Sequence, residues 1–145
     1  MAISKRCEYA LRAIFELGVR NTGQPVKIQA IAQAQSIPTR FLEAILNELK
    51  HAGFVASKRG NDGGYYLVRQ IEELKVSEIM EAIQGSIAVG PESSDHDTYC
   101  RGDHAFDAFW ANVNHTILDV CGSTTFAQLK QTESKSLEQV HHYWI

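Results

Sequence analysis

The chain has 145 residues, 44% of them apolar, which is enough to bury one core with an appended element. No apolar run approaches the roughly 20 residues needed to cross a bilayer, and the first residues lack the hydrophobic stretch of a secretory signal. The three cysteines, Cys7, Cys100 and Cys121, are widely spaced and form no C-x-x-C pair, which suits a reducing compartment rather than a disulfide scaffold. We therefore expect a cytoplasmic protein that does not enter a membrane.

Charge is divided unevenly along the chain. The formal net charge is −3, but residues 1–69 hold ten Lys and Arg against five Asp and Glu, and residues 70–145 hold four against twelve. A basic amino-terminal half indicates a surface for a polyanion, and the acidic half would not face that partner. The negative total is therefore compatible with binding to double-stranded DNA.

The amino-terminal half predicts three helices. Apolar residues at helical spacing predict one helix over residues 4–20, a short one over 28–35 and a longer one over 38–51. The turn between the last two begins at Ser36, a position where such turns often carry glycine. A short helix, a tight turn and a second helix form the helix-turn-helix layout.

The second helix of this motif is the expected reading helix, with its first turns in the major groove. Glu43 can accept a hydrogen bond from a cytosine amino group, or it is an ordinary solvated helix position. Arg40 suits a phosphate, because half or more of such contacts go to the DNA backbone. The exposed positions predicted to contact DNA are Thr39, Arg40, Glu43 and Asn47. The residues predicted to lie in the core are Phe41, Leu42 and Ile45.

A glycine-rich hairpin follows immediately. Two short apolar runs flank the segment Ser57-Lys58-Arg59-Gly60-Asn61-Asp62-Gly63-Gly64, and glycine accepts the positive φ that a tight turn needs. By itself this pattern favours a plain hairpin with a solvated tip. Behind a helix-turn-helix it predicts a wing, in which Arg59, beside Lys58 and Gly60, reaches into a narrow, electronegative minor groove.

The second half of the chain predicts further helices around a loop. Residues 76–83 are amphipathic and end at a glycine, and residues 86–102 lack any apolar period, which is typical of a functional or mobile loop. A long helix over residues 103–120 comes next. Residues 124–129 predict a short capped helix, and the remaining residues form a polar tail with an aromatic end.

The long helix carries an apolar stripe that is broad for a small winged-helix core. Its economical partner is the same helix in a second copy, since two-fold dimers match pseudo-palindromic DNA; the alternative is packing onto its own domain. The predicted dimer contacts are Phe106, Phe109, Trp110, Val113 and Ile117. The predicted fold is mainly α: a winged helix-turn-helix domain with a two-stranded wing over residues 1–84, a sensor loop over 85–102, and a dimerisation helix with a carboxyl-terminal tail over 103–145.

Motifs of enzyme chemistry are missing from the sequence. The chain has no G-x-S-x-G, Walker, H-E-x-x-H or zinc-type C-x-x-C pattern. The glycines near Gly63 lie between strands rather than at the start of a helix, so they form no phosphate cradle. We expect a binding protein rather than an enzyme. The competing class is a winged-helix module that binds protein instead of DNA.

Four segments match a known pattern when they are taken together. They are Cys7-Glu8-Tyr9-Ala10-Leu11-Arg12-Ala13, Thr39-Arg40-Phe41-Leu42-Glu43, Arg59-Gly60 with Gly63-Gly64-Tyr65, and the long helix with Trp110. They resemble the IscR/NsrR/CymR family of bacterial transcription regulators. The resemblance implies a homodimeric winged-helix repressor or dual regulator in the cytoplasm, with base contact by Glu43 and minor-groove insertion of Arg59.

The chain departs from that family in its sensor. Cluster-binding members carry three cysteines in the loop before the long helix, whereas this chain presents Glu92, Thr98, His104 and Asp107 at the family's ligand positions, with Cys100 offset from them. An all-cysteine iron–sulfur site is therefore not expected, since such clusters are held mainly by thiolates.

Three alternatives remain for the signal. Cys100 and His104 bind a cluster or metal in mixed ligation with Glu8 from the first helix, or Cys100 acts as a redox-sensitive thiol. In the third, neither sensor exists: His96 and His104 are plain loop and helix-cap residues, and a small molecule or a partner enzyme controls the protein. The cofactor is left unassigned, and Cys7 and Cys121 are predicted to be small core residues.

Overall fold

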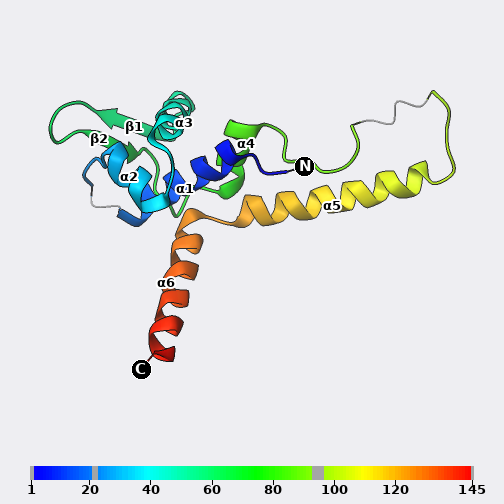
Figure 1. Cartoon of the computed structure of the whole chain (residues 1–145). Helices are drawn as coiled ribbons and strands as arrows, with labels where there is room; N and C mark the ends of the chain where they lie inside the picture. The colour runs from blue at the N-terminus through cyan, green and yellow to red at the C-terminus, as the bar shows by residue number, and fades with distance from the viewer. Residues whose placement is uncertain (1, 21–22, 93–96, 145) are drawn as a thin grey trace.

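The computed structural model is mainly helical with one two-stranded antiparallel sheet, which confirms the predicted fold class (Figure 1). It describes residues 2–20, 23–92 and 97–144. Within these ranges no helix combines the length and the apolar character that a membrane crossing requires. The elements are α1 (Lys5–Arg20), α2 (Ile28–Gln35), α3 (Thr39–His51), β1 (Val55–Lys58), β2 (Gly64–Leu67), α4 (Val76–Gln84), α5 (Asp103–Ser123) and α6 (Phe126–Tyr143).

The helix-turn-helix consists of α2 and α3, which pack with α1 around one apolar core. The residues of α3 that share its buried face are Leu42, Ile45, Leu46 and Leu49. The prediction that Phe41 belongs to this core is wrong, because its side chain is 47% exposed. One residue along a helix is a rotation of about 100°, and this rotation turns Phe41 away from the buried face.

Ser36 makes the turn between α2 and α3 in a left-handed conformation, with φ 53° and ψ 44°. Glycine is usual at such a position because a Cβ atom is unfavourable at positive φ. The N–H groups of Ser36 and Ile37 both donate to the Ala32 carbonyl. These two bonds close the end of α2 and fix the direction in which α3 leaves it.

The wing is the hairpin of β1 and β2, with Ser57 directly opposite Tyr65. The segment before α2 pairs with its base, because Val26 and Tyr65 each donate an N–H to the other's carbonyl at 2.8 Å. Gly64 permits this approach. Its φ is +149°, and an added Cβ atom would lie 2.4 Å from the Val26 carbonyl oxygen. The wing is therefore fastened to the body of the protein at its base.

The corner between α5 and α6 packs into the winged-helix core through the buried side chain of Phe126. Backbone hydrogen bonds hold this corner against the segment before α4. The Val76 N–H donates to the Thr124 carbonyl at 2.9 Å, and the Phe126 N–H donates to the Leu74 carbonyl at 3.0 Å. The last two helices are thus anchored at the point where they meet.

Beyond this corner, α5 and α6 extend from the core in different directions (Figure 1). The predicted short helix over residues 124–129 is too short, because α6 continues to Tyr143. It begins with a capping box, in which Thr125 and Gln128 each accept a backbone N–H of the other. Residues 131–144 are all exposed. The rest of this helix therefore has no buried face of the kind that makes a helix easy to recognise in a sequence.

Gly64→Ala is expected to lower the free energy of unfolding by about 1–3 kcal/mol, the cost of one strained backbone position. The methyl group would collide with the Val26 carbonyl at a φ that alanine disfavours. Chemical denaturation measures the change. Gly122→Ala is the matched control, because the nearest atom its methyl group would meet is Ser77 Oγ at 3.8 Å, and alanine favours a helix. Wild-type stability in Gly64→Ala would contradict the fastening of the wing.

Candidate nucleic-acid interface

The outer surface of α3 carries the polar side chains that the sequence assigns to reading. Thr39, Arg40, Glu43 and Asn47 are all exposed. A groove of about 460 Å³ runs between this surface and the wing. The residues that line it are Arg40, Glu43, Ala44, Asn47 and Tyr65. The reading helix and the wing therefore border one concave surface.

The tip of the wing presents Lys58, Arg59 and Gly60, all exposed. Gly60 has a φ of +107°, and its carbonyl accepts the N–H three residues further on at 3.0 Å. Lys27 Nζ donates to the Asn61 carbonyl at 2.7 Å, which braces the tip against the segment before α2. Neither Lys58 nor Arg59 forms an ion pair with another described residue. Both charges are therefore available to a polyanion.

The reading helix and the wing form one unit. Lys50, in the last turn of α3, donates to Ser57 Oγ on β1 at 2.7 Å. The Phe54 N–H donates to the Leu49 carbonyl at 3.0 Å, so the chain turns directly from α3 into the wing. The separation between the reading face and the wing tip is therefore set by the protein before any ligand binds.

Arg6 connects three helices behind the reading face. From α1 it donates one N–H to the Glu48 carboxylate in α3 and another to the Ile83 carbonyl at the end of α4, the latter at 2.7 Å. The Gln84 side chain bonds to the backbone of Ala2 and Ser4, at 3.1 Å in each case. Because α4 leads into the loop before α5, these contacts link that loop mechanically to α3.

Three residues of this surface are not among the DNA contacts that the sequence predicts. Phe41 is exposed beside Arg40, whose guanidinium lies 4.7 Å from the centre of its ring; a helical wheel of the leucine stripe would have revealed it. Tyr65 borders the groove because it lies opposite Ser57, and opposite residues of a hairpin share a face. Lys27 has no local signal, since it reaches the wing only through tertiary pairing.

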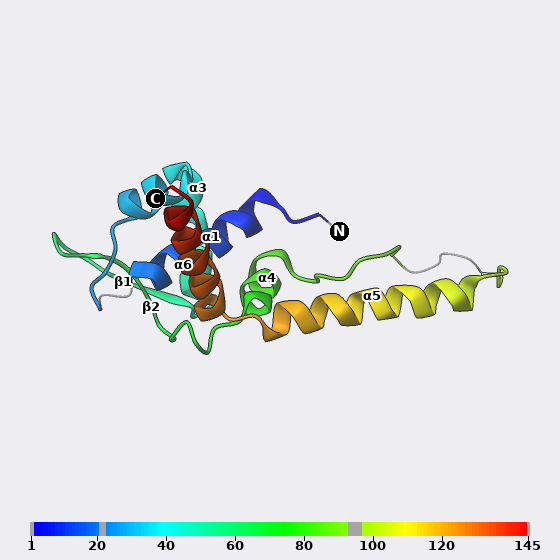
Figure 2. The same cartoon turned by 90° about the horizontal axis from the view of Figure 1, so that it is seen from below.

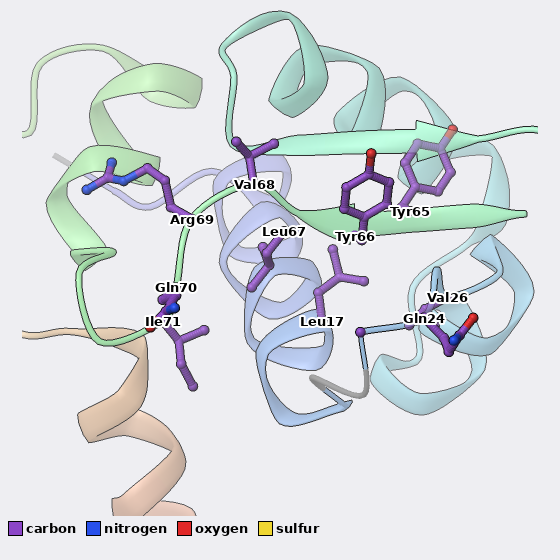
Figure 3. A pocket seen from close by; sticks show the side chains of 11 residues that line it. Leu17, Gln24, Val26, Tyr65, Tyr66, Leu67, Val68, Arg69, Gln70 and Ile71 are labelled. Atoms are coloured by element: carbon purple, nitrogen blue, oxygen red, sulfur yellow. The ribbon is translucent and has the colours of Figure 1, made fainter.

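A smaller hollow of about 150 Å³ lies at the base of the wing, between β2 and the end of α1 (Figure 3). Leu17, Leu67 and Ile71 contribute apolar walls. Arg69 borders it but points toward α4, where it donates to Glu78 at 2.7 Å. This hydrogen bond holds the pKa of Glu78 below its ordinary value. The charge of Arg69 is thus engaged within the protein, and the hollow is a poor candidate for an anionic ligand.

The predicted dimer stripe on α5 divides into two parts. Trp110, Val113 and Ile117 are half-buried, and Ile117 packs against the protein's own core. Phe106 and Phe109, nearer the start of the helix, are 65% and 53% exposed. The described residues of the chain therefore leave Phe106 and Phe109 uncovered.

The segment after α4 is strapped to α5. Asn114 accepts the Val89 N–H at 2.6 Å and donates to the Val89 carbonyl at 3.0 Å. Gly90 lies against the Trp110 ring so closely that an added Cβ atom would be 3.1 Å from it. Figure 2 shows this segment alongside α5. The strap accounts for the half-buried state of Trp110.

The predicted sensor residues do not form a cluster within one chain. Glu8 lies on α1, paired with cations of the same helix. Cys100 lies just before α5 and His104 lies in its first turn, at the end of α5 that projects away from α1 in Figure 1. Across the described parts of the chain, no three His, Cys, Asp or Glu side chains gather as metal ligands would. His96 lies outside the described residues.

The three cysteines occupy different environments. Cys7 is buried, as predicted, and burial raises the pKa of its thiol. Cys121 is half-buried against the same core, at the opposite end of α5 from Cys100. Cys100 is exposed, and its N–H donates to the Asp103 carboxylate at 2.7 Å. One thiol of the chain is therefore freely accessible.

Residues 3–132 match the model of the Rrf2 family, described as iron-dependent transcriptional regulators. The chain belongs to the Rrf2 family. It is 32% identical over 130 residues to an HTH-type transcriptional regulator of Mycobacterium tuberculosis, which covers 89% of this chain and 81% of that protein.

Two solved structures of similar proteins share this architecture. CymR, the global cysteine regulator of B. subtilis, superposes with a TM-score of 0.81 at 26% identity, over 91% of this chain and 98% of that one. IscR of T. potens gives 0.76 at 26% identity, over 94% and 90%. These likenesses confirm the resemblance and the winged-helix fold that the sequence motifs predict.

The residues of this Rrf2-family chain do not fit an iron–sulfur cluster. Such clusters are held mainly by thiolates, and Cys100 is the single accessible one. Its Sγ lies 3.7 Å from the Thr98 carbonyl, while the neighbouring His104 ring stacks on Tyr99 with 5.0 Å between centroids. The donor set of one chain therefore differs from the one that the family description implies.

Purified anaerobically from iron-replete cells, the protein is expected to be colourless and free of iron, because one accessible thiolate is too few for a cluster. Visible absorption and iron analysis measure this. Cys100→Ser is the comparison variant and should give the same spectrum as the wild type. A chromophore with bound iron that disappears in Cys100→Ser would contradict the expectation.

Proposed function

We propose that the chain is a sequence-specific DNA-binding repressor that acts in the cytoplasm as a homodimer, and that it is not an enzyme. The observation that carries the proposal is the fixed unit of α3 and the wing. Lys50 joins the two elements through Ser57, and Arg59 stands exposed at the tip. The likeness to the regulators CymR and IscR supports the same function.

In the proposed complex, the first turns of α3 enter the major groove and the wing enters the adjacent minor groove. Glu43 accepts a hydrogen bond from a cytosine amino group, which is the base contact that its carboxylate can make. Arg59 inserts into the minor groove, where the negative potential is strongest when the groove is narrow. The residues that contact phosphates or neighbouring bases are Thr39, Arg40, Asn47, Lys58 and the backbone at Gly60.

The proposed homodimer forms through α5. Its 21 residues span about 30 Å. Antiparallel pairing of two such helices would bring Phe106 and Phe109 of one copy towards the exposed Val120 of the other. Trp110, Val113 and Ile117 would support this contact from the half-buried side of the helix. The resulting two-fold axis matches a pseudo-palindromic operator.

The proposed signal is one that does not need a cluster. The arrangement of donors favours oxidation of the exposed Cys100 thiol, a small molecule or a partner enzyme over ligation by Cys100, His104 and Glu8. The strap of Asn114 on Val89 and the bonds of Arg6 provide a path by which such a signal reaches α3.

Arg59→Ala is expected to weaken operator binding by about 1–3 kcal/mol, the scale of one good groove contact. Gel-shift titration over a salt series measures it, and the wild type should lose affinity steeply as salt rises, because phosphate contacts release counterions. Lys135→Ala on α6 is the control, because it removes the same charge from an exposed position far along the chain.

Two results would count against this account. Wild-type protein without salt-dependent duplex affinity would favour the protein-binding module instead. Equal affinity of Arg59→Ala and the wild type would remove the wing tip from the mechanism.

Glu43→Ala is expected to relax base preference more than it changes total affinity, since the lost carboxylate reads a base rather than a phosphate. A randomised-site selection compares the two preferences. Glu133→Ala, which removes an exposed carboxylate from α6, serves as the control. The base-reading role of Glu43 fails if both variants select the same sites as the wild type.

A further inference from the structure

We propose that the groove between α3 and the wing seats one sugar–phosphate strand of the duplex, and that the Tyr65 hydroxyl donates a hydrogen bond to a phosphate in it. This inference rests on the proposed function. It adds a contact residue and assigns a ligand, a backbone phosphodiester, to a groove that the sequence motifs leave without one.

The geometry of the two reading elements requires a seat for that strand. If α3 occupies the major groove and Arg59 the neighbouring minor groove, the backbone that separates these two grooves must pass between helix and wing. The space at this place is the groove of about 460 Å³. The width of the groove cannot adjust freely, because Lys50 of α3 donates a hydrogen bond to Ser57 of β1 at 2.7 Å and so joins the two elements that border it.

The charges around the groove suit a polyanion. Arg40 is the cation in its lining, and the elements that border it carry further exposed cations, Lys50 on α3 and Lys58 and Arg59 on the wing. None of the four pairs with a carboxylate among the described residues. Glu43 is the single acidic residue in the lining, and it repels a phosphate close to itself. Counted over α3 and the wing, the four unpaired cations outnumber Glu43 and the exposed Asp62 of the wing turn, so this surface attracts a phosphodiester strand.

Tyr65 is held in place for a contact of this kind. Its N–H and its carbonyl are both bonded to Val26 at 2.8 Å, which fixes the backbone of β2 beneath the side chain. The ring is half-buried, yet its hydroxyl makes no hydrogen bond with another described residue. A phenol O–H can donate to a phosphate oxygen, and a side chain that is already ordered loses little entropy on binding.

Tyr66 offers a matched comparison on the same strand (Figure 3). Side chains of successive strand residues point to opposite faces, and Tyr66 pairs with Ala56 rather than with Ser57. It is outside the lining of the groove, carries the same phenol group and is 42% exposed. Removal of its hydroxyl therefore makes the same chemical change away from the proposed strand.

Tyr65→Phe is expected to reduce affinity about tenfold, the scale of one hydrogen bond to a charged group. The loss should be equal for the selected operator and for a random duplex, with base preference unchanged. Tyr66→Phe should bind as the wild type does. Thermal unfolding of both variants should match the wild type, which separates a lost contact from a disturbed wing.

Duplexes with a single neutral methylphosphonate locate the phosphate. At one linkage the substitution should weaken the wild type but not Tyr65→Phe, because the contact is already absent there. Unchanged affinity of Tyr65→Phe, an altered base preference, or additive effects at every linkage would each overturn the inference. If Arg59→Ala weakens binding while Tyr65→Phe does not, this inference fails and the proposed function stands. Loss of duplex affinity in the wild type would instead end the proposed function itself.

Discussion

The two hydrogen bonds between Val26 and Tyr65 are the constraint on which the reading surface depends. They join the segment before α2 to the wing, and Gly64 makes room for them because no side chain stands in the way. Because β2 is held in place, Ser57 on the partner strand β1 can accept a hydrogen bond from Lys50. Lys27 donates a second hydrogen bond to the backbone of the wing tip. Helix, turn and wing are thus linked by short contacts in a ring. The consequence is a surface of fixed spacing, which reading two adjacent grooves demands.

The same chain leaves its last two helices largely uncovered. Phe106 and Phe109 on α5 are exposed, and Tyr143 and Trp144 at the end of α6 are 90% and 85% exposed. Helices in water owe most of their stability to the packing of an apolar face, and here the described residues leave that face uncovered. This is the physical argument for a second copy, and it complements the symmetry argument from DNA. The core beside Phe126 anchors both helices. A movement at the far end of either helix would therefore be transmitted to the winged-helix domain.

The loop before α5 combines a family likeness with an unusual donor set. Members of the family are described as iron-dependent, yet this chain exposes one thiol, buries another and half-buries the third. Hydrogen bonds and packing nevertheless connect the loop to α5 and to α3. Asn114 and Trp110 hold its first residues against α5, and Arg6 ties the end of α4 to the reading helix. Such a path can serve several kinds of signal, because it depends on the position of a backbone rather than on a particular ligand.

The sequence by itself determined the helix-turn-helix, the wing and the exposure of the residues that we propose to contact DNA, because helical spacing, glycines and a capping turn act over a few neighbouring residues. It predicted wrongly for Phe41, where one residue of helical rotation separates core from solvent, and for the length of α6, whose second half is exposed and mostly polar. Only the tertiary structure decided how Tyr65 and Lys27 join the surface formed by α3 and the wing, and why Glu8 and Cys100 do not meet within one chain. Those relations join residues far apart in the chain, and they follow from backbone pairing and packing that no local pattern records.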